Sequence, residues 1–422
     1  MKFSKTTLPN GLRLILVPMQ DNKTVTAMVL VEAGSRFESK ENNGISHFLE
    51  HMCFKGTKKR PSALAISTEF ESMGAHHNAF TSGTYTGYYG KVSSDKAEKI
   101  LEMVSDLYLN ATLPEKEIEK EKGVVIEEIN MNLDKPQRIV WDVLDELAYG
   151  NHPLGRTVLG TKETVKSLTE ADLESYRKEH YVPAKTVVTI AGKFDENKMR
   201  KAVKDLFGKI RSSKVKLMKK VKENQTAPQN KIYFKGTDQS HLVIGFRSFD
   251  RFQEKKVYAA SILRIILGGG MSSRLFQRLR EDLGLCYYIG AGQRLEQDCG
   301  MFTISAGVSN SKIEEAIKEI INEVRKILKN GPTNAEIKKA KDYKLGSLYL
   351  GLETSDQLAD WYAFQEIEHD QLQNPLEYEE NIKKVTKEQI MKVAEEIFKS
   401  ENANLAIVGP HKDKNLSDWI KI

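Results

Sequence analysis

The order of apolar and polar positions along the chain predicts interleaved strands and amphipathic helices. Apolar runs and β-rich stretches predict strands over residues 12–17, 25–32, 76–89 and 186–192. Apolar residues at helical spacing predict helices over residues 44–56, 62–73, 95–110, 113–132, 168–181 and 197–207. The polar segment at 20–23 is expected to be the turn that joins the first two strands. We therefore expect a mixed α and β domain in the first half.

The same order of elements restarts after a segment without periodicity. Residues 211–230 are polar, rich in lysine and include Pro228, which indicates a linker. Beyond it the pattern predicts strands over 240–249, 301–308 and 405–408, and helices over 255–267, 273–283, 312–329, from Pro332 onward and over 386–398. We infer an internal duplication, with an N-terminal domain at 1–210, the linker at 211–230 and a C-terminal domain at 231–422.

Composition and charge narrow the classes of protein to consider. The 422 residues carry a net charge of +6, spread over 64 basic and 58 acidic residues, so a nucleic-acid partner is not expected. No apolar run approaches the ~18 residues of a membrane span, and the run at 12–17 contains Arg13, unlike a signal peptide. Three widely spaced cysteines fit a reducing compartment, and Cys53 is expected to be buried. The expected location is the cytoplasm, without a membrane partner.

One short stretch in the first half carries metal chemistry. On a helix, His47, Glu50 and His51 of the sequence HFLEH share one face. Two histidines one turn apart can bind one zinc ion, and the carboxylate between them can take a proton from water at the metal. This order is the inverse of the commoner H-E-x-x-H zinc motif. His76 and His77 are not expected to bind one ion together, because neighbouring strand residues point to opposite faces.

A third ligand is expected on the helix predicted over 113–132. Glu121 and Glu128 lie within its apolar stripe, where an unpaired carboxylate is costly. We choose Glu128 as the third ligand and Glu121 as a residue that orients a ligand histidine. Alternatively, both carboxylates pair with Lys or Arg from a neighbouring helix. The second half has KKVYAASILR in place of the motif and Ser347 opposite Glu128, so one metal ion per chain is expected.

These features resemble the insulinase/pitrilysin family of inverted-motif zinc metallopeptidases, in its short-chain form, which includes the mitochondrial processing peptidases. The resemblance is carried by residues 47–57 (HFLEHMCFKGT), 121–128 (EKGVVIEE) and 273–287 (SRLFQRLREDLGLCY), and it extends over essentially the whole chain. It implies an α+β fold of two homologous domains. Each would be an antiparallel-rich sheet covered by helices, and the two would form half of a clam-like chamber.

The resemblance also implies an activity and the residues that perform it. The chain is expected to be a zinc endopeptidase, with Zn2+ held by His47, His51 and Glu128 and with Glu50 as the general base. Asn78 and Ala79 are expected on an exposed strand that binds peptide substrate as a further strand. Arg280 and Tyr287 would contact substrate near the scissile bond, with Tyr287 assisting the oxyanion. Family members of this length pair two chains, so a homodimer is expected, with Arg280 and Tyr287 reaching the zinc of the partner chain.

Three alternatives stay open. Relatives of this family act as non-catalytic scaffold or partner subunits, although those typically lose ligands or the base, which this chain keeps. The chain could be an iron or manganese hydrolase of other chemistry, because two histidines and one carboxylate also describe an iron site, although the glutamate between the histidines favours hydrolysis. Arg280 could simply pair with Glu281 or Asp282 on the surface.

Overall fold

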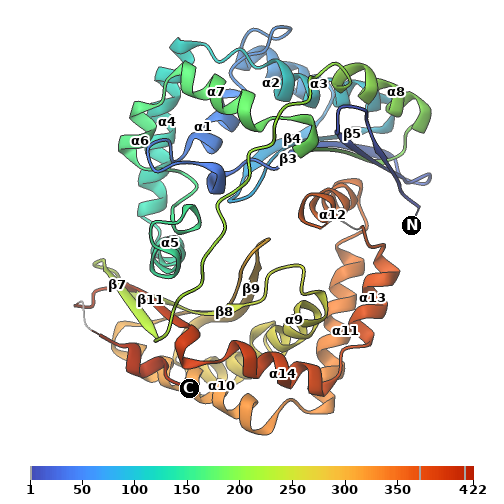
Figure 1. The fold of residues 1–422 in the computed structure, drawn as a ribbon. Coiled ribbons are helices and arrows are strands. Elements are labelled where there is room, and N and C mark those ends of the chain that lie inside the picture. The colour runs from blue at the N-terminus through green and yellow to red at the C-terminus, as the bar shows by residue number, and fades with distance from the viewer. Residues whose placement is uncertain (1, 370–371, 413–414) are drawn as a thin grey trace. The chain divides into compact units, whose positions relative to one another are not determined.

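The computed structural model describes residues 2–369, 372–412 and 415–422 (Figure 1). Its strands are β1 (Ser4–Thr7), β2 (Arg13–Pro18), β3 (Thr24–Val31), β4 (His76–Thr81), β5 (Thr86–Ser93), β6 (Thr186–Gly192), β7 (Gln229–Phe234), β8 (Gln239–Ser248), β9 (Cys286–Leu295), β10 (Gly300–Ser309) and β11 (Ala403–Gly409). Its α-helices are α1 (Ile45–Met52), α2 (Ala63–Ser72), α3 (Ala97–Asn110), α4 (Glu115–Leu133), α5 (Pro136–Tyr149), α6 (Lys162–Ser167), α7 (Glu170–His180), α8 (Glu196–Phe207), α9 (Glu254–Gly268), α10 (Ile313–Asn330), α11 (Asn334–Leu350), α12 (Ser355–Glu368), α13 (Pro375–Lys383) and α14 (Lys387–Ile397).

The first sheet has the strand order β1-β2-β6-β3-β5-β4. The polar turn at 20–23 joins β2 to β3, but these strands are not neighbours, because β6 lies between them. Every residue of β6 is buried, so both of its faces are covered. Such a strand belongs in the middle of a sheet. It pairs parallel with β2 and antiparallel with β3. Strand β4 ends the sheet and pairs with β5 alone among the described strands.

Both faces of the first sheet are covered by helices. One face forms a core with buried apolar residues of α1, α2, α3, α4, α7 and α8. The other face packs against α12, whose Ser355 hydroxyl lies 2.8 Å from that of Thr26. Ion pairs hold α12 in place, from Lys91 to Asp356 at 2.6 Å and from Lys5 and Arg13 to Glu366 at 2.7 and 3.6 Å. The first core and the α12 layer together fix β4 and α1 on a rigid support.

The second sheet repeats the plan of the first. Its order is β7-β11-β8-β10-β9, and its one parallel pair in the described chain, β7 with β11, corresponds to β2 with β6. Helix α5 packs on one face of this sheet through Val140 and Leu144. The other face forms a core with α9, α10, α11 and α14. The predicted duplication and the mixed fold of two helix-covered, antiparallel-rich sheets are confirmed.

The two compact units do not follow the linear division at residues 211–230. The first unit comprises residues 1–130, 156–219 and 349–373, and the second comprises 131–155, 220–348 and 374–422. The difference has a simple cause, because each half contributes one helix to the other sheet: α5 packs on the second sheet and α12 on the first. The predicted linker has no helix or strand up to residue 228, but β7 begins inside it at Gln229.

Two further observations concern expectations from composition. Cys53, Cys286 and Cys299 are all buried, as expected for Cys53. Among the helices of the described residues, none combines the length and the apolar character that a membrane crossing requires.

Candidate metal centre

Helix α1 places the motif in a tightly held position. Gly44 precedes the helix with φ of 98°, a conformation that favours glycine, and a Cβ atom there would lie 2.7 Å from the carbonyl oxygen of Leu159. The carboxylate of Glu38 accepts hydrogen bonds from the backbone N–H groups of Gly44 at 2.8 Å and Ser46 at 2.9 Å. A carboxylate there satisfies otherwise unpaired N–H groups and complements the helix dipole. The start of α1 is thereby fixed.

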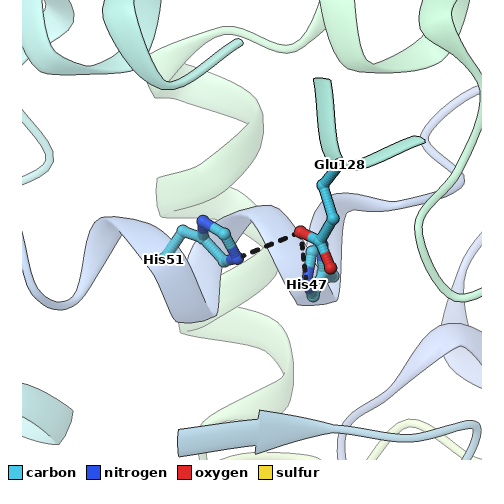
Figure 2. Close-up of side chains that lie close together, drawn as sticks. All are labelled: His47, His51 and Glu128. Carbon is cyan, nitrogen blue, oxygen red and sulfur yellow. Dashed lines mark ion pairs between the residues drawn. The ribbon is translucent and has the colours of Figure 1, made fainter. Parts of the chain in front are cut away.

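The two histidines lie side by side on α1, as their spacing predicts. Their ring centroids are 4.5 Å apart. Helix α4 brings Glu128 to the same point, with its Oε2 atom 3.6 Å from Nε2 of His47 and 3.7 Å from Nε2 of His51. Figure 2 shows the carboxylate of Glu128 reaching toward both rings. Residues 77 positions apart in the chain, 51 and 128 (128 − 51 = 77), thus share one site.

The surroundings shift the pKa values of the two imidazoles in opposite directions. Burial, together with the nearby charge of His51, lowers the pKa of His47 to about 3, so its ring is neutral. Burial also lowers the pKa of His51, but its hydrogen bond to Glu121 and the surrounding carboxylates outweigh burial and raise the pKa overall. Nδ1 of His51 lies 2.8 Å from Glu121, which leaves Nε2 facing Glu128. Lys55 pairs with the other oxygen of Glu121 at 2.6 Å.

These residues fit a zinc ion. Ligand atoms of His47, His51 and Glu128 all lie within 4.8 Å of one another. Zinc bonds of 2.0–2.2 Å in a tetrahedron place ligand atoms roughly 3.4 Å apart. The Oε2 atom of Glu128 lies at about this distance, 3.6 and 3.7 Å, from the Nε2 atoms of the two histidines. Glu121 holds the far nitrogen of His51 as carboxylates do behind zinc-bound histidines. The predicted ligand set and the orienting Glu121 are therefore brought together. Glu121 also has the lysine partner that the alternative interpretation expected.

Glu50 lies on the same helix and is 9% exposed. Its Oε2 atom accepts a hydrogen bond from the hydroxyl of Thr81 at 2.5 Å. Burial raises the pKa of Glu50, and the charge of Glu128 adds to this, while Thr81 and His51 oppose it. The carboxylate that is expected to move protons is thus oriented by the edge strand β4.

Comparisons with known proteins agree with this geometry. Residues 14–162 match the family model described as insulinase (peptidase family M16), and residues 167–344 match the one described as peptidase M16 inactive domain. The chain is 37% identical to the uncharacterized zinc protease YmxG of Bacillus subtilis, over 84% of this chain and 85% of that protein. A Streptomyces coelicolor protein, also named an uncharacterized zinc protease, is 33% identical over 98% of this chain and 91% of its own.

This chain belongs to the M16 peptidase family. Solved structures agree in fold. A protease from Helicobacter pylori superposes with a TM-score of 0.91 at 26% identity, covering 97% of this chain and 99% of the other. A structure from Pseudomonas fluorescens described as a peptidase M16 inactive domain gives a TM-score of 0.90 at 18% identity, over 98% and 99% of the two chains, which shows the fold alone.

The substrate residues expected from the M16 resemblance lie on β4, on β9 and on the helical turn before β9. Asn78 and Ala79 are on β4, and the Ala79 N–H donates to the side-chain oxygen of Asn78 at 2.9 Å rather than to β5. His76 and His77 lie on the same strand. His77 stacks on Phe70 at 3.9 Å while His76 approaches Tyr89 at 6.1 Å, so they have different surroundings.

Arg280 and Tyr287 form a local pair in the second unit. Arg280 lies on the π-helical turn η5 (Phe276–Asp282), and its Nη1 donates to the backbone oxygen of Tyr287 at 2.6 Å. Tyr287 is 56% exposed. No ion pair joins Arg280 to Glu281 or Asp282, and Asp282 instead lies 3.8 Å from Arg278. The simple surface-pair interpretation of Arg280 is therefore wrong.

Sequence reasoning missed two residues that position the M16 site. Glu38 lies in the loop before α1, and Thr81 lies at the end of β4, so neither belongs to a periodic pattern near the motif. A weak signal did exist for Glu38, because a carboxylate shortly before a helix is a common cap. Thr81 gives no such signal, since its contact with Glu50 spans 31 residues.

Proposed function

We propose that this chain is a zinc-dependent endopeptidase. The observation that carries the proposal is the meeting of His47, His51 and Glu128 at one point, with Glu50 on the same helix. Two imidazole nitrogens and one carboxylate are a ligand set that hydrolytic zinc enzymes use. The names of the relatives, zinc proteases, support the same chemistry.

The chain's own residues supply the proton transfers. His47, His51 and Glu128 would hold a zinc ion, which would supply Lewis-acid polarisation of the scissile carbonyl and a lower pKa of bound water. Glu50 accepts the proton of the attacking water and later delivers it to the leaving amine. Thr81 keeps the carboxylate of Glu50 in position. Glu121 keeps the Nε2 lone pair of His51 directed into the site by holding its Nδ1.

The proposed substrate is a peptide or unfolded segment that adds to β4 as a further strand. The support is that β4 is an edge strand and that the Ala79 N–H is directed away from β5. Main-chain hydrogen bonds give affinity with little dependence on sequence. By family resemblance, two copies close a chamber around the substrate, and Arg280 and Tyr287 of the partner subunit complete the site with Tyr287 assisting the oxyanion.

Replacing Glu50 by glutamine tests the proposal. Glu50→Gln should bind one zinc ion per chain, measured by metal analysis, and lose at least about 100-fold in cleavage of a quenched fluorescent peptide, the usual minimum for a general base. Glu127→Gln is the control, because Glu127 is exposed on α4 beside Glu128 and should leave cleavage unchanged. A fully active Glu50→Gln protein would refute the assignment. A wild-type protein that holds zinc and cleaves no peptide would favour the scaffold alternative.

A further inference from the structure

A pocket of about 490 Å³ lies in the second unit, between the end of α5 and the segment that leads into β7. Its walls are the last turn of α5 with the residues that follow, the segment at 221–229, and Arg247 of β8. Its volume is within the range of small-molecule sites in proteins, roughly 300–1,000 Å³. All of the lining residues belong to the second unit, whereas the metal centre lies in the first.

One wall of this pocket is irregular, because residues 221–227 form no helix or strand, yet side chains hold it in place. The backbone N–H of Val221 donates to the carboxylate of Asp298 at 2.7 Å. The side-chain amide of Gln225 donates to the backbone oxygen of Ala403 at 3.1 Å. The wall is therefore attached to the second sheet and to the loop before β10, and the pocket is part of the fold.

Arg247 is an enclosed cation in this pocket, with its side chain 13% exposed. Its Nη2 atom donates to the backbone oxygen of Ala148 on α5, and its Nε atom lies 3.1 Å from the carboxylate of Glu223. Its guanidinium carbon lies 4.5 Å from the centroid of the Tyr149 ring. These contacts leave the Nη1 atom, which is buried and has no hydrogen-bond partner among the described residues. A buried donor without a partner is costly, so a ligand that accepts a hydrogen bond from it is favoured.

Two further donor groups line the same pocket, the ammonium of Lys222 and the imidazole of His152. Nδ1 of His152 accepts a hydrogen bond from the backbone N–H of Leu154 at 3.1 Å. In the neutral ring the proton is therefore on Nε2, which makes that atom a donor. None of the described residues that line the pocket is an aspartate or a glutamate. Even with Glu223 balancing the charge of Arg247, the ammonium of Lys222 leaves the site positive.

We propose that this pocket binds a small organic anion, whose phosphate or carboxylate group accepts a hydrogen bond from Arg247 and pairs with Lys222. A charged donor and an ammonium together suit either oxyanion. The pocket is larger than one such group, and the side chains of Asn224 and Thr226 offer hydrogen bonds to the rest of a polar ligand. The contacts with α5 and with Glu223 account for Nη2 and Nε of the arginine, but not for Nη1 or for the cavity. The proposal does not rest on the proposed peptidase function.

Calorimetric titration of the zinc-loaded protein tests the site, with ribose 5-phosphate and succinate as anions and ribose as the neutral probe. Arg247→Lys should weaken binding of the anions about 10-fold or more, as expected for hydrogen bonds to a charged group. Lys222→Met should weaken it about threefold, the effect of one exposed charge pair. Thr226→Trp, which fills the pocket without changing its charge, should abolish binding. Lys220→Met is the matched control, because Lys220 is exposed two residues before Lys222 and is not part of the lining.

The outcomes separate a specific pocket from a general attraction of anions. Binding of ribose 5-phosphate or succinate, but not of ribose, that Thr226→Trp abolishes supports the proposal, and the better anion identifies the oxyanion group. Binding that Thr226→Trp leaves intact lies elsewhere, including at the metal centre, and overturns it. So does the absence of binding of both anions at millimolar concentration, or an equal loss in Lys220→Met and Lys222→Met.

The test does not depend on a variant that disturbs the fold. Lys222 and Thr226 are exposed, so their variants should keep the wild-type melting temperature even if Arg247→Lys, which alters contacts with α5, does not. The readout is binding of a small anion rather than cleavage. The result therefore holds whether or not the chain cleaves peptides, and failure of either proposal leaves the other standing.

Discussion

At the scale of single residues, the role of Glu121 is open to a direct test. Its Oε1 atom lies 2.8 Å from Nδ1 of His51, and Lys55 holds its other oxygen. Carboxylates in this position orient a ligand histidine and raise its basicity, and removing them costs about 10–100-fold in metal affinity. Glu121→Ala should therefore weaken zinc binding by that factor, measured by competition with a chelator of known affinity.

The control for this prediction is on the same helix. Glu119 is exposed and pairs with Lys122, so Glu119→Ala removes one negative charge from α4 without touching the histidines. Its zinc affinity should stay within about twofold of wild type. Equal losses in both variants would show that the total charge of α4, rather than the contact with His51, sets the affinity.

The sequence predicts the residues of this site as far as helical periodicity reaches. The spacing of His47, Glu50 and His51 places them on one face of a helix, and the apolar stripe of the following helix singles out Glu121 and Glu128. Glu38 and Thr81 escape this reasoning. They meet α1 through a loop and a strand end, and their contacts depend on the tertiary fold, which periodicity does not encode.

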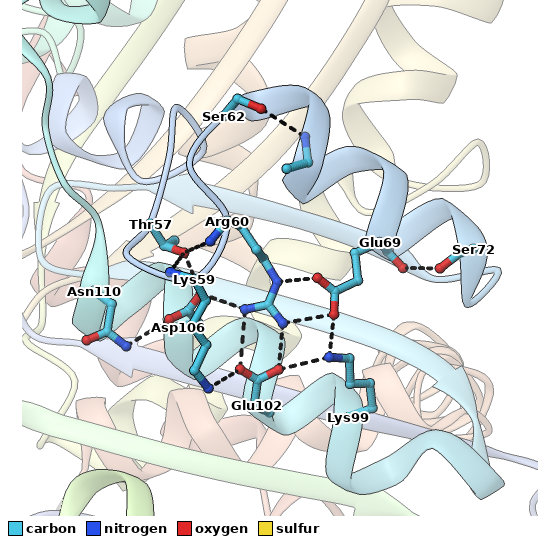
Figure 3. Close-up of polar contacts among 11 residues, drawn as sticks. Thr57, Lys59, Arg60, Ser62, Glu69, Ser72, Lys99, Glu102, Asp106 and Asn110 are labelled. Atoms are coloured by element: carbon cyan, nitrogen blue, oxygen red, sulfur yellow. Dashed lines mark hydrogen bonds and ion pairs between the residues drawn. The ribbon is translucent and has the colours of Figure 1, made fainter.

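At the scale of elements, a buried arginine ties together the segment that follows α1. Arg60 lies between α1 and α2, with its side chain 6% exposed. It binds Glu69 of α2 at 2.5 Å and Glu102 and Asp106 of α3 at 2.6 Å each (Figure 3). Two helices and the loop between α1 and α2 are therefore joined at one guanidinium.

Arg60→Met should destabilise the chain by about 3 kcal/mol at neutral pH, because it leaves buried carboxylates without their partner. Hydrogen bonding to Arg60 lowers the pKa of Glu69 to about 2. For Glu102, burial raises the pKa, but the bonds to Arg60 and its neighbours outweigh it and leave the pKa at about 2. Carboxylates with a lowered pKa stabilise the fold above their unfolded pKa and lose that effect as they protonate. The loss of unfolding free energy in Arg60→Met, relative to wild type, should therefore become smaller as the pH falls from 4.5 toward 2.

Urea unfolding at several pH values measures this effect. Lys59→Met is the control, since Lys59 is largely exposed and pairs with the same Glu102. Its cost should be below about 1 kcal/mol, as for other surface pairs. A pH-independent loss in Arg60→Met would mean that packing of the arginine side chain, and not its charge, holds α2 and α3 together.

Whether a segment forms a helix or a strand could largely be predicted from the sequence. Which elements lie beside one another in the fold could not. The helices around residues 47, 121 and 313 were found because each has a continuous apolar stripe. The insertion of β6 between β2 and β3 was missed, because strand order depends on which strand can be buried on both faces. Helices α5 and α12 were missed as well, and their apolar residues face the sheet of the opposite half.

At the scale of the whole molecule, divergence after duplication explains why one group of potential metal ligands, in the first unit, is found in the described part of the chain. Both halves keep the sheet order and the buried positions of the two site helices. The polar residues between those positions have diverged, to His47 and Glu128 in the first unit and to Ser261 and Ser347 in the second. A fold can keep its core and change its chemistry in this way because function depends on the few residues that face the site.

The free energy of unfolding should depend on the protonation of one buried histidine near α1. His180 ends α7 with its side chain 2% exposed, and it packs against Tyr176 and Phe37. Tyr176 in turn shares a hydrogen bond of 2.7 Å with Ser46 of α1. Burial, aided by the charge of Lys216, lowers the pKa of His180 to about 4. The folded chain therefore keeps this imidazole neutral at a pH where an unfolded chain has already protonated it.

The sign of the effect follows from proton linkage. Below its usual pKa near 6.5, the histidine takes up a proton more readily in the unfolded state, so the free energy of unfolding falls as pH drops from 6.5 toward 4. The difference between the unfolded pKa near 6.5 and the folded pKa of about 4 corresponds to about 3 kcal/mol of unfolding free energy, because one pKa unit is worth about 1.36 kcal/mol.

His180→Gln should lose stability less steeply than wild type over this pH range. Urea unfolding measures this, with both proteins at the same metal loading so that protonation of the metal ligands affects them equally. His76→Gln, which alters an exposed imidazole on β4, should keep the wild-type slope. If the slope of His180→Gln also equals that of wild type, acid unfolding begins elsewhere, and α7 does not link protonation to the support of α1.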